Sequence, residues 1–362
     1  MKILHITAIN TLQSRSGIPV VVRKLCEYQN KIDGIEARAL SLRADAKEAN
    51  SPFFDNLDGN SFCSYVRKYC PDIVIIHDFY YIQYIPIAIC LKWYRIPFVI
   101  EPHGAFGKQA MKKSWLMKVI ANNTIFRSLI KGANGLIFLN DGEMMDSEYN
   151  NNRMVVIPNG VDKNDVEHTY AKSYNISSEP IFYFMGRFDI NHKGLDYLFD
   201  ALDILNAKKE PLTVRFYGVG SDKEMLYLHD RINKIKNINV DFRGAVFDEE
   251  KVKALRETNI LLLTSRYEGF PMTILEALSF GNPCLVTPGT NVADEIESHK
   301  LGWKSELNGK AIADCILLAK NDYKRNYASY YVACRQYVLD KYQWSKIADQ
   351  SIESYMKLVD RA

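Results

Sequence analysis

One stretch of the chain decides its fold: YEGFPMTILEAL, residues 267–278. It follows ILLL at 260–263, a short apolar run without alternation that predicts a strand buried on both faces. Pro271 suits the first position of a helix, where its missing N–H is not needed. Apolar residues at helical spacing, among them Ile274 and Leu278, then give that helix a buried stripe. The sequence therefore predicts a strand, a turn and a helix in succession.

This segment carries two carboxylates. Glu268 falls in the predicted turn, and Glu276 lies on the helix, pointing away from the apolar stripe. A helix N-terminus after a parallel strand attracts anions such as phosphates, and carboxylates accept hydrogen bonds strongly from sugar hydroxyls. The alternative is structural, with Glu276 a solvated helix residue and Glu268 a turn acid near a favourable helix dipole.

The composition indicates a globular enzyme. At 362 residues the chain predicts two domains, and 47% hydrophobic with 25% charged residues is ordinary for this class. A net charge of +3 is too small to indicate nucleic acid as a partner. Seven cysteines without a C-x-x-C pair predict reduced thiols in a cytosolic setting. The first residues predict a strand rather than a signal peptide, and residues 80–91, the most apolar stretch, are too short to span a bilayer.

The N-terminal half alternates strands and helices, which predicts a parallel sheet. Gly17 lies between a strand at residues 2–7 and a helix at 20–29. A glycine in this position belongs either to a loop that approaches a bound phosphate or to an ordinary turn between strand and helix. His103 follows a strand at 98–100, at the strand end where such sheets bind ligands. We expect His103 to donate a hydrogen bond to a sugar hydroxyl. The other predicted strands of this half cover residues 73–76, 135–139 and 155–157.

A basic stretch lies between Lys108 and Lys131, with Trp115 and other apolar residues among the charges. A basic amphipathic helix of this kind is typical of contact with an anionic membrane surface. The alternative is a solvated helix with its apolar side in the core.

The C-terminal half begins a second series of strands and helices after a polar linker at 163–179. Gly186 ends a strand at 181–185, and Arg187 and Lys193 lie in the connection to the next helix. Two cations at a strand end can neutralise a diphosphate, because the arginine makes bidentate hydrogen bonds to it and the lysine adds a compact positive charge. Further strands are predicted at 213–217, 238–242, 261–263 and 284–286, and a final helix at 344–359. Arg243 and Val246 follow one of these strands as candidate walls of a nucleobase site.

Taken in order, these motifs resemble the retaining nucleotide-sugar glycosyltransferases of family 4. The match is most specific at residues 186–196 and at 268–278, which carry the Glu-x7-Glu signature. The resemblance implies an α/β fold of the GT-B type, with two Rossmann-like domains whose parallel sheets face each other across a cleft. The domains are expected at 1–165 and 175–340, with a helix at about 344–362 packing back on the first. It also implies transfer from a nucleotide-activated sugar with retention of configuration.

The resemblance implies a role for each matched residue. Arg187 and Lys193 would hold the donor diphosphate, and His103 would contact the sugar near its C6 hydroxyl. Glu268 would bind sugar hydroxyls, and Glu276 the ribose. The remaining positions would complete the donor site: Gly17, Gly186, Arg243, Val246, Gly269, Phe270, Pro271, Met272 and Thr273. No metal and no further cofactor is implied, and we expect UDP rather than GDP in the donor.

One departure from the family concerns its first loop, which commonly carries two consecutive glycines. Here Gly17 is followed by Ile18 and Pro19, and the proline removes one N–H group from the phosphate approach.

The acceptor is the least determined part of the prediction. The resemblance implies a glycan or lipid-linked glycan, used in capsule, exopolysaccharide or similar synthesis by a cytoplasmic enzyme on the inner face of the membrane. Two alternatives stay open. A nucleotide-sugar epimerase would need acid and base groups on the sugar ring, and an inactive partner subunit of a transferase would have degenerate motifs.

Overall fold

The computed structural model describes residues 1–8, 17–43, 53–57, 59–108, 126–149, 153–162 and 179–359. The chain divides into two compact units. The first comprises Met1–Gly160 together with Trp344–Ala362, and the second comprises Val161–Gln343. Most of the polar linker predicted at 163–179 lies outside the described residues, as does most of the basic stretch between Lys108 and Lys131.

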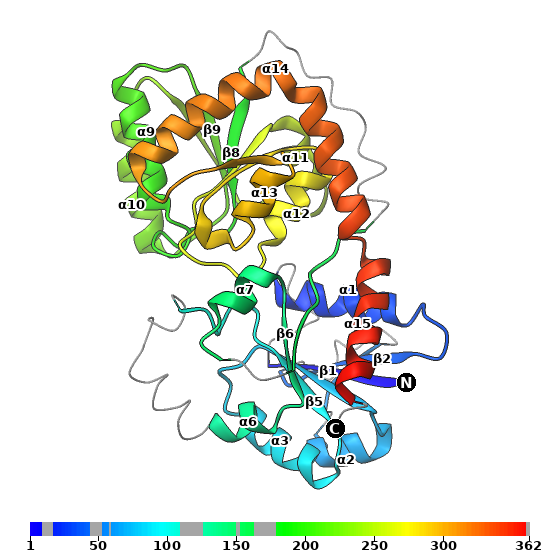
Figure 1. Ribbon diagram of the computed structural model, residues 1–362. Helices are drawn as coiled ribbons and strands as arrows, with labels where there is room; N and C mark the ends of the chain where they lie inside the picture. Colours follow the sequence, from blue (N-terminus) through cyan, green and yellow to red (C-terminus); the bar gives the residue numbers. More distant parts are fainter. Residues whose placement is uncertain are drawn as a thin grey trace. The chain divides into compact units, whose positions relative to one another are not determined.

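The first unit is built on a parallel sheet with the strand order β3-β2-β1-β4-β5-β6-β7 (Figure 1). Its strands are β1 Lys2–Thr7, β2 Glu36–Ser41, β3 Phe54–Asp55, β4 Ile73–His77, β5 Phe98–Glu101, β6 Gly135–Phe138 and β7 Met154–Val156. The central strands β4, β5 and β6 are buried at every position. Continuous apolar runs form such strands because helices cover both faces of the sheet.

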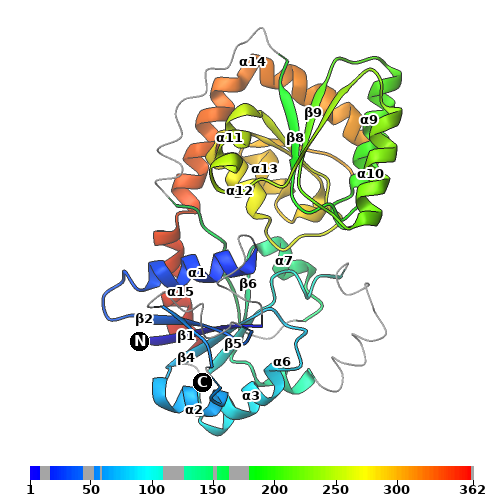
Figure 2. The same cartoon turned by 180° about the vertical axis from the view of Figure 1, so that it is seen from behind.

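Helices lie on both faces of this sheet (Figures 1 and 2). They are α1 Ile18–Gln29, α2 Phe62–Tyr69, α3 Tyr84–Trp93, α6 Arg127–Gly132, α7 Asp141–Asp146 and α15 Trp344–Val359. The last helix, α15, lies beside α1 in both views, and Gln29 of α1 donates a hydrogen bond to Ser351 of α15 over 2.9 Å. The helices α2, α3 and α6 cover the opposite face.

The second unit repeats this plan with the strand order β10-β9-β8-β11-β12-β13, again parallel. Its strands are β8 Ile181–Met185, β9 Thr213–Tyr217, β10 Asn239–Gly244, β11 Ile260–Leu263, β12 Cys284–Val286 and β13 Gly302–Lys304. Its helices are α9 Leu195–Ala207, α10 Asp222–Lys234, α11 Asp248–Glu257, α12 Met272–Ser279, α13 Ala293–Ser298 and α14 Gly309–Lys341, with a short 3-10 turn at Pro288–Thr290. The long helix α14 contacts both α9 and α12, and its backbone leaves the helical conformation at Asn326.

Two Rossmann-like parallel sheets confirm the predicted fold class. In each sheet the strand order reverses at one point, between β1 and β4 in the first unit and between β8 and β11 in the second. Open α/β sheets bind ligands beside the carboxyl ends of the strands at such a reversal. This edge of each sheet is therefore where a site is expected.

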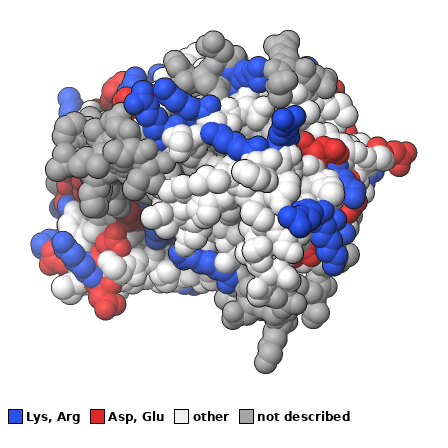
Figure 3. Space-filling model, turned by 90° about the horizontal axis from the view of Figure 1, so that it is seen from below, with Lys and Arg blue, Asp and Glu red and all other residues white. Residues whose placement is uncertain are grey.

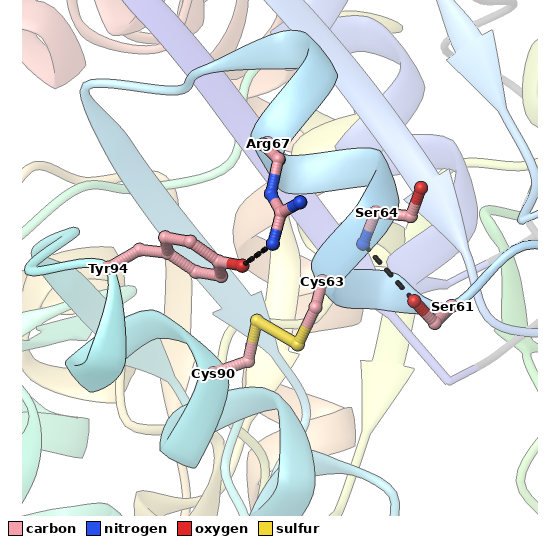
Figure 4. Close-up of a disulfide and its surroundings, with 6 residues drawn as sticks. All are labelled: Ser61, Cys63, Ser64, Arg67, Cys90 and Tyr94. Atoms are coloured by element: carbon pink, nitrogen blue, oxygen red, sulfur yellow. Dashed lines mark hydrogen bonds between the residues drawn. A yellow bond between two sulfur atoms is a disulfide. The ribbon is translucent and has the colours of Figure 1, made fainter.

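The expectation of reduced thiols throughout is wrong for one pair of cysteines. Cys63 of α2 and Cys90 of α3 form a disulfide, with their Cα atoms 6.0 Å apart (Figure 4). The two helices pack side by side on one face of the sheet, and this contact, not any sequence spacing, brings the sulfurs together. The five free cysteines are Cys26, Cys70, Cys284, Cys315 and Cys334.

Among the residues that the structure describes, no helix combines the length and the apolarity needed to cross a membrane.

Candidate active site

The connection from β8 to α9 is fixed by backbone hydrogen bonds. The N–H of Gly186 donates to the carbonyl of Tyr217 over 2.9 Å, and the N–H of Lys193 donates to the carbonyl of Asp189 over 2.8 Å. Arg187 extends from this connection with a largely exposed side chain, 3.7 Å from the carboxylate of Asp189. Both predicted cations thus lie at the carboxyl end of β8.

The centre of the site is a contact between Lys193 and Glu268. The Lys193 ammonium lies 2.6 Å from Oε1 of Glu268, and the two side chains are only 15% and 9% exposed. Ser265 donates a second hydrogen bond to the same Oε1 over 2.5 Å. A cation and a carboxylate are thereby held together at the adjacent ends of β8 and β11, because these two strands are neighbours in the sheet.

His192 joins the two loops that carry this pair, although the sequence analysis gave it no role. Its Nε2–H donates to the carbonyl of Tyr267 over 2.8 Å, and its ring stacks on the Tyr267 ring at 4.2 Å between centroids. Burial lowers the pKa of His192, with Glu268 acting in the opposite direction. Asn291 adds a hydrogen bond to the carbonyl of Glu268 over 2.6 Å. In the sequence, only its position before Lys193 pointed to His192, because its partner Tyr267 is 75 residues away.

Gly194 allows the two loops to approach closely. Its φ is +61°, and a Cβ there would lie 2.0 Å from the carbonyl oxygen of Thr264. We expect Gly194→Ala to lower the free energy of unfolding by about 3 kcal/mol, since a left-handed conformation and a backbone clash both add cost. Urea titration of the purified variant measures this change.

Gly244→Ala is the matched control for that prediction. Gly244 has φ +70°, but no described residue lies within 4 Å of the position that a Cβ would take there. Only the conformational cost of about 1 kcal/mol is then expected. Equal losses in the two variants would show that the close approach at Thr264 is not what Gly194 provides.

Glu276 lies on α12 with one oxygen paired and one unpaired. Its Oε1 accepts from the ammonium of Lys251, on α11, over 2.5 Å. Its Oε2 is buried and has no hydrogen-bond partner among the described residues. A buried acceptor without a partner is costly unless a ligand satisfies it. Lys251 is a further site residue that the sequence analysis missed.

The start of α12 differs slightly from the prediction. Pro271 is the N-cap rather than the first helical residue, and the helix begins at Met272. Met272 and Thr273 therefore occupy the first turn, where backbone N–H groups have no intrahelical acceptor. Gly269 and Phe270 connect this turn to Glu268.

The residues expected at a nucleobase, Arg243 and Val246, lie at the end of β10 and just after it, beside the end of β9. Gly218, which follows β9, donates its N–H to the carbonyl of Gly244 over 2.8 Å, and a Cβ on Gly218 would lie 1.9 Å from the carbonyl oxygen of Gly186. Arg243 precedes Gly244, and its guanidinium lies 2.5 Å from Asp241. Val246 follows in the connection to α11.

His103 lies in the first unit, directly after β5. Its backbone has φ +49°, and its side chain is almost fully buried. Glu143 fixes this turn, since its carboxylate accepts from the N–H groups of Gly104, over 2.5 Å, and Leu139, over 2.7 Å. Burial lowers the pKa of His103 to about 3, so its ring is neutral near pH 7.

One group of side chains in the described part of the chain has the composition of a metal site. His77, Glu101 and His103 each offer one ligand atom, and the three atoms lie within 4.8 Å of one another. Imidazole and carboxylate are common zinc ligands. The two rings also hydrogen-bond each other, Nδ1 of His77 lying 3.0 Å from Nε2 of His103, so the group is complete without an ion.

Gly17 also belongs to the first unit. It caps α1 with φ +72°, and its carbonyl accepts from Val20 and Val21. Residues 9–16, which precede it, lie outside the described residues. Of the predicted site, the structure therefore brings Lys193 and Glu268 into contact within the second unit, while His103 and Gly17 lie in the first.

Comparison with known proteins assigns both units to one family. A family model for group 1 glycosyl transferases matches residues 166–333, and a model for glycosyltransferase family 4 matches residues 15–165. The chain is 25% identical over 256 residues to the N,N'-diacetylbacillosaminyl-diphospho-undecaprenol alpha-1,3-N-acetylgalactosaminyltransferase of Campylobacter jejuni, covering 65% of each chain. It spans between 24% and 65% of the length of the first three curated relatives that it matches.

Solved structures agree on the fold. A glycosyltransferase from Rickettsia africae superposes with a TM-score of 0.77 and 17% identity, over 100% of this chain and 99% of that chain. The Anabaena protein HepE in complex with UDP superposes with a TM-score of 0.69 and 17% identity, over 99% and 100%. The superpositions and the two parallel sheets both indicate the GT-B fold. With both family models matched, the chain belongs to the group 1 and family 4 glycosyltransferases.

Proposed function

We propose that this protein is a retaining glycosyltransferase that moves a sugar from a nucleotide-diphosphate donor to a glycan or lipid-linked glycan. One observation carries the proposal. Within the described residues, the Lys193–Glu268 pair offers a cation and a carboxylate, and the buried, unpartnered Oε2 of Glu276 on the next helix offers a second hydrogen-bond acceptor. These three groups match the diphosphate, the sugar hydroxyls and the ribose hydroxyls of a nucleoside diphosphate sugar.

The residues of the second unit take the following roles. Arg187 and Lys193 neutralise the diphosphate, and the N–H groups in the first turn of α12 donate to it. Glu268 accepts from sugar hydroxyls, and Oε2 of Glu276 accepts from the ribose. The leaving diphosphate gains charge in the transition state, so cations already in place lower the barrier. These two cations supply the charge that a divalent metal would otherwise supply.

For the nucleotide we propose UDP in preference to GDP. The support is the structural likeness to HepE, which was solved with UDP. For the acceptor we propose a lipid-linked glycan used in capsule or other surface polysaccharide. The support is the similarity to the Campylobacter enzyme, whose name gives a sugar linked to undecaprenol diphosphate as its own acceptor.

We also propose contact with the inner face of the cell membrane, through a surface around α3. Three large apolar side chains along this helix and its preceding turn are exposed: Ile82 by 66%, Ile89 by 64% and Trp93 by 82%. Four cations of α3, of the residues just after it and of α6, which contacts α3, are also exposed: Lys92, Arg95, Arg127 and Lys131. Figure 3 views the molecule from the side of α2, α3 and α6 and shows an area without charged side chains, around which Lys and Arg side chains lie together with some Asp and Glu. Exposed apolar side chains with exposed cations on the same helices suit an anionic bilayer surface.

Replacing Ile89 by Asp and Trp93 by Ala together should weaken membrane binding by at least about tenfold, because two apolar side chains that would enter the bilayer surface are lost. Flotation with phosphatidylglycerol-rich vesicles measures the effect. Leu226→Asp is the control, since Leu226 is 72% exposed on α10 of the other unit. Equal binding of the double variant and the control would contradict a membrane role for α3.

The stereochemistry of the product tests the reaction type. An α-linked UDP-sugar should give an α-linked product, read from the anomeric coupling in proton NMR. A β-linked product would contradict retention. Interconversion of the donor sugar in the absence of any acceptor would instead indicate an epimerase.

A further inference from the structure

A chain of buried polar side chains runs through the first unit from α15 to His103. Its members, in order, are Ser351, Gln29, His5, His77 and His103. The first four are fully buried, and they lie on α15, α1, β1 and β4. No role in the proposed reaction has been given to any of them except His103.

The direction of hydrogen bonding is set at the α15 end of this chain. The hydroxyl of Ser351 donates to the carbonyl of Ala348 over 2.6 Å, so its oxygen accepts from Nε2 of Gln29 over 2.9 Å. The amide oxygen of Gln29 is then left to accept, and Nε2 of His5 lies 2.8 Å from it. His5 therefore carries its proton on Nε2.

A neutral imidazole has one N–H and one acceptor nitrogen, so the direction of the hydrogen bond on one side of each ring fixes the direction on the other side. Burial lowers the pKa of His5 to about 4 and that of His103 to about 3, and it lowers the pKa of His77 well below the usual value. Nδ1 of His5 accepts from Nε2–H of His77 over 2.9 Å. Nδ1 of His77 then accepts from Nε2–H of His103, 3.0 Å away.

Glu101 lies beside the last step of this chain. Its Oε2 lies 3.3 Å from Nδ1 of His77, and its Oε1 lies 3.4 Å from Nε2 of His103. The one lone pair on Nδ1 of His77 already accepts from Nε2–H of His103, so Oε1 of Glu101 adds only a second, longer acceptor for that N–H. Burial, together with the nearby carboxyls of Glu143 and Asp78, raises the pKa of Glu101 well above its usual value.

We infer that His5 and His77 are positioning residues that hold His103 as the Nε2–H tautomer, with Nδ1 left to accept a hydrogen bond from a sugar hydroxyl. His103 is thus an acceptor, the opposite sense to the donor role expected from sequence. The contacts of the His103 ring with His77 and Glu101 are both made by Nε2 and not by Nδ1. The identity of the hydroxyl rests on the proposed function, but the tautomer does not.

Nitrogen-15 NMR of histidine-labelled, chelator-treated full-length protein tests the tautomers without any substrate. Long-range proton–nitrogen correlations at neutral pH should show Nε2–H rings at His5, His77 and His103. The reverse direction would give Nδ1–H rings at all three and would overturn the inference. So would a zinc titration that shifts the His77 and His103 signals at stoichiometric ion, because these nitrogens would then be metal ligands. Retained tautomers in a protein without transferase activity would instead refute the proposed function.

Discussion

Glu268→Gln should lower kcat at least about a hundredfold while leaving the fold intact. The carboxylate holds Lys193 and Ser265 with Oε1, and its Oε2 lies 3.8 Å from Nε2 of His192. An amide has no charge to keep the ammonium in place, and it turns one acceptor into a donor toward either Lys193 or the sugar. Nucleotide release from a UDP-sugar, measured as an initial rate, gives the size of the loss.

Glu257→Gln is the matched control for this prediction. Glu257 is an exposed carboxylate in the same unit, 3.3 Å from Arg215, so its variant should turn over like the wild type. Both variants should unfold cooperatively with similar midpoints. Wild-type turnover in Glu268→Gln would remove Glu268 from the site, and a collapsed fold would assign it a structural role only.

Lys193→Met should have a comparable effect on activity and an additional effect on stability. It removes a positive charge from the diphosphate, which we expect to lower kcat/KM by about a thousandfold. It also leaves the mostly buried carboxylate of Glu268 without its cation, and the free energy of unfolding should fall by about 2 kcal/mol. Steady-state kinetics and urea unfolding of one preparation measure the two losses.

Two further variants separate these effects. Lys234→Met removes an exposed lysine 2.7 Å from Asp230 on α10, and should change neither quantity measurably. Lys193→Met combined with Glu268→Gln removes both charges, so stability should recover in part while activity stays lost. Full activity in Lys193→Met, or no recovery of stability in the double variant, would contradict the coupling of this pair.

Strands buried on both faces were predictable from sequence. The runs that became β1, β8, β9 and β12 were placed with the bounds that the structure has, because each is rich in the β-branched, aromatic or other apolar residues that favour strands. The strands β2, β3 and β13 were missed. β3 and β13 are short edge strands of two and three residues, and β2, EARALS, has no continuous apolar run.

Only the part of the candidate site that follows from a residue's position at the end of a strand could be predicted from sequence. Arg187, Lys193 and Glu268 were placed at strand ends, and the contact between Lys193 and Glu268 follows because β8 and β11 are neighbours. Lys251 and His77 were missed. Their partners are brought near by packing between elements that sequence spacing does not pair.

The same limit explains the disulfide and the direction of hydrogen bonding at His103. Cys63 and Cys90 are 27 residues apart on separate helices, and nothing in their spacing indicates a pair. The tautomer of His103 depends on Ser351, which is far away in sequence and is joined to it only through α1, β1 and β4.

The most direct test of the account is donor hydrolysis and binding across UDP-, GDP- and dTDP-sugars, with and without membrane lipid extract. We expect slow release of UDP from one UDP-sugar, accelerated by the extract as the lipid-linked acceptor is glycosylated. Binding without release under any condition would contradict it and indicate an inactive partner subunit. Conversion of the donor to another UDP-sugar without acceptor would contradict it in favour of an epimerase.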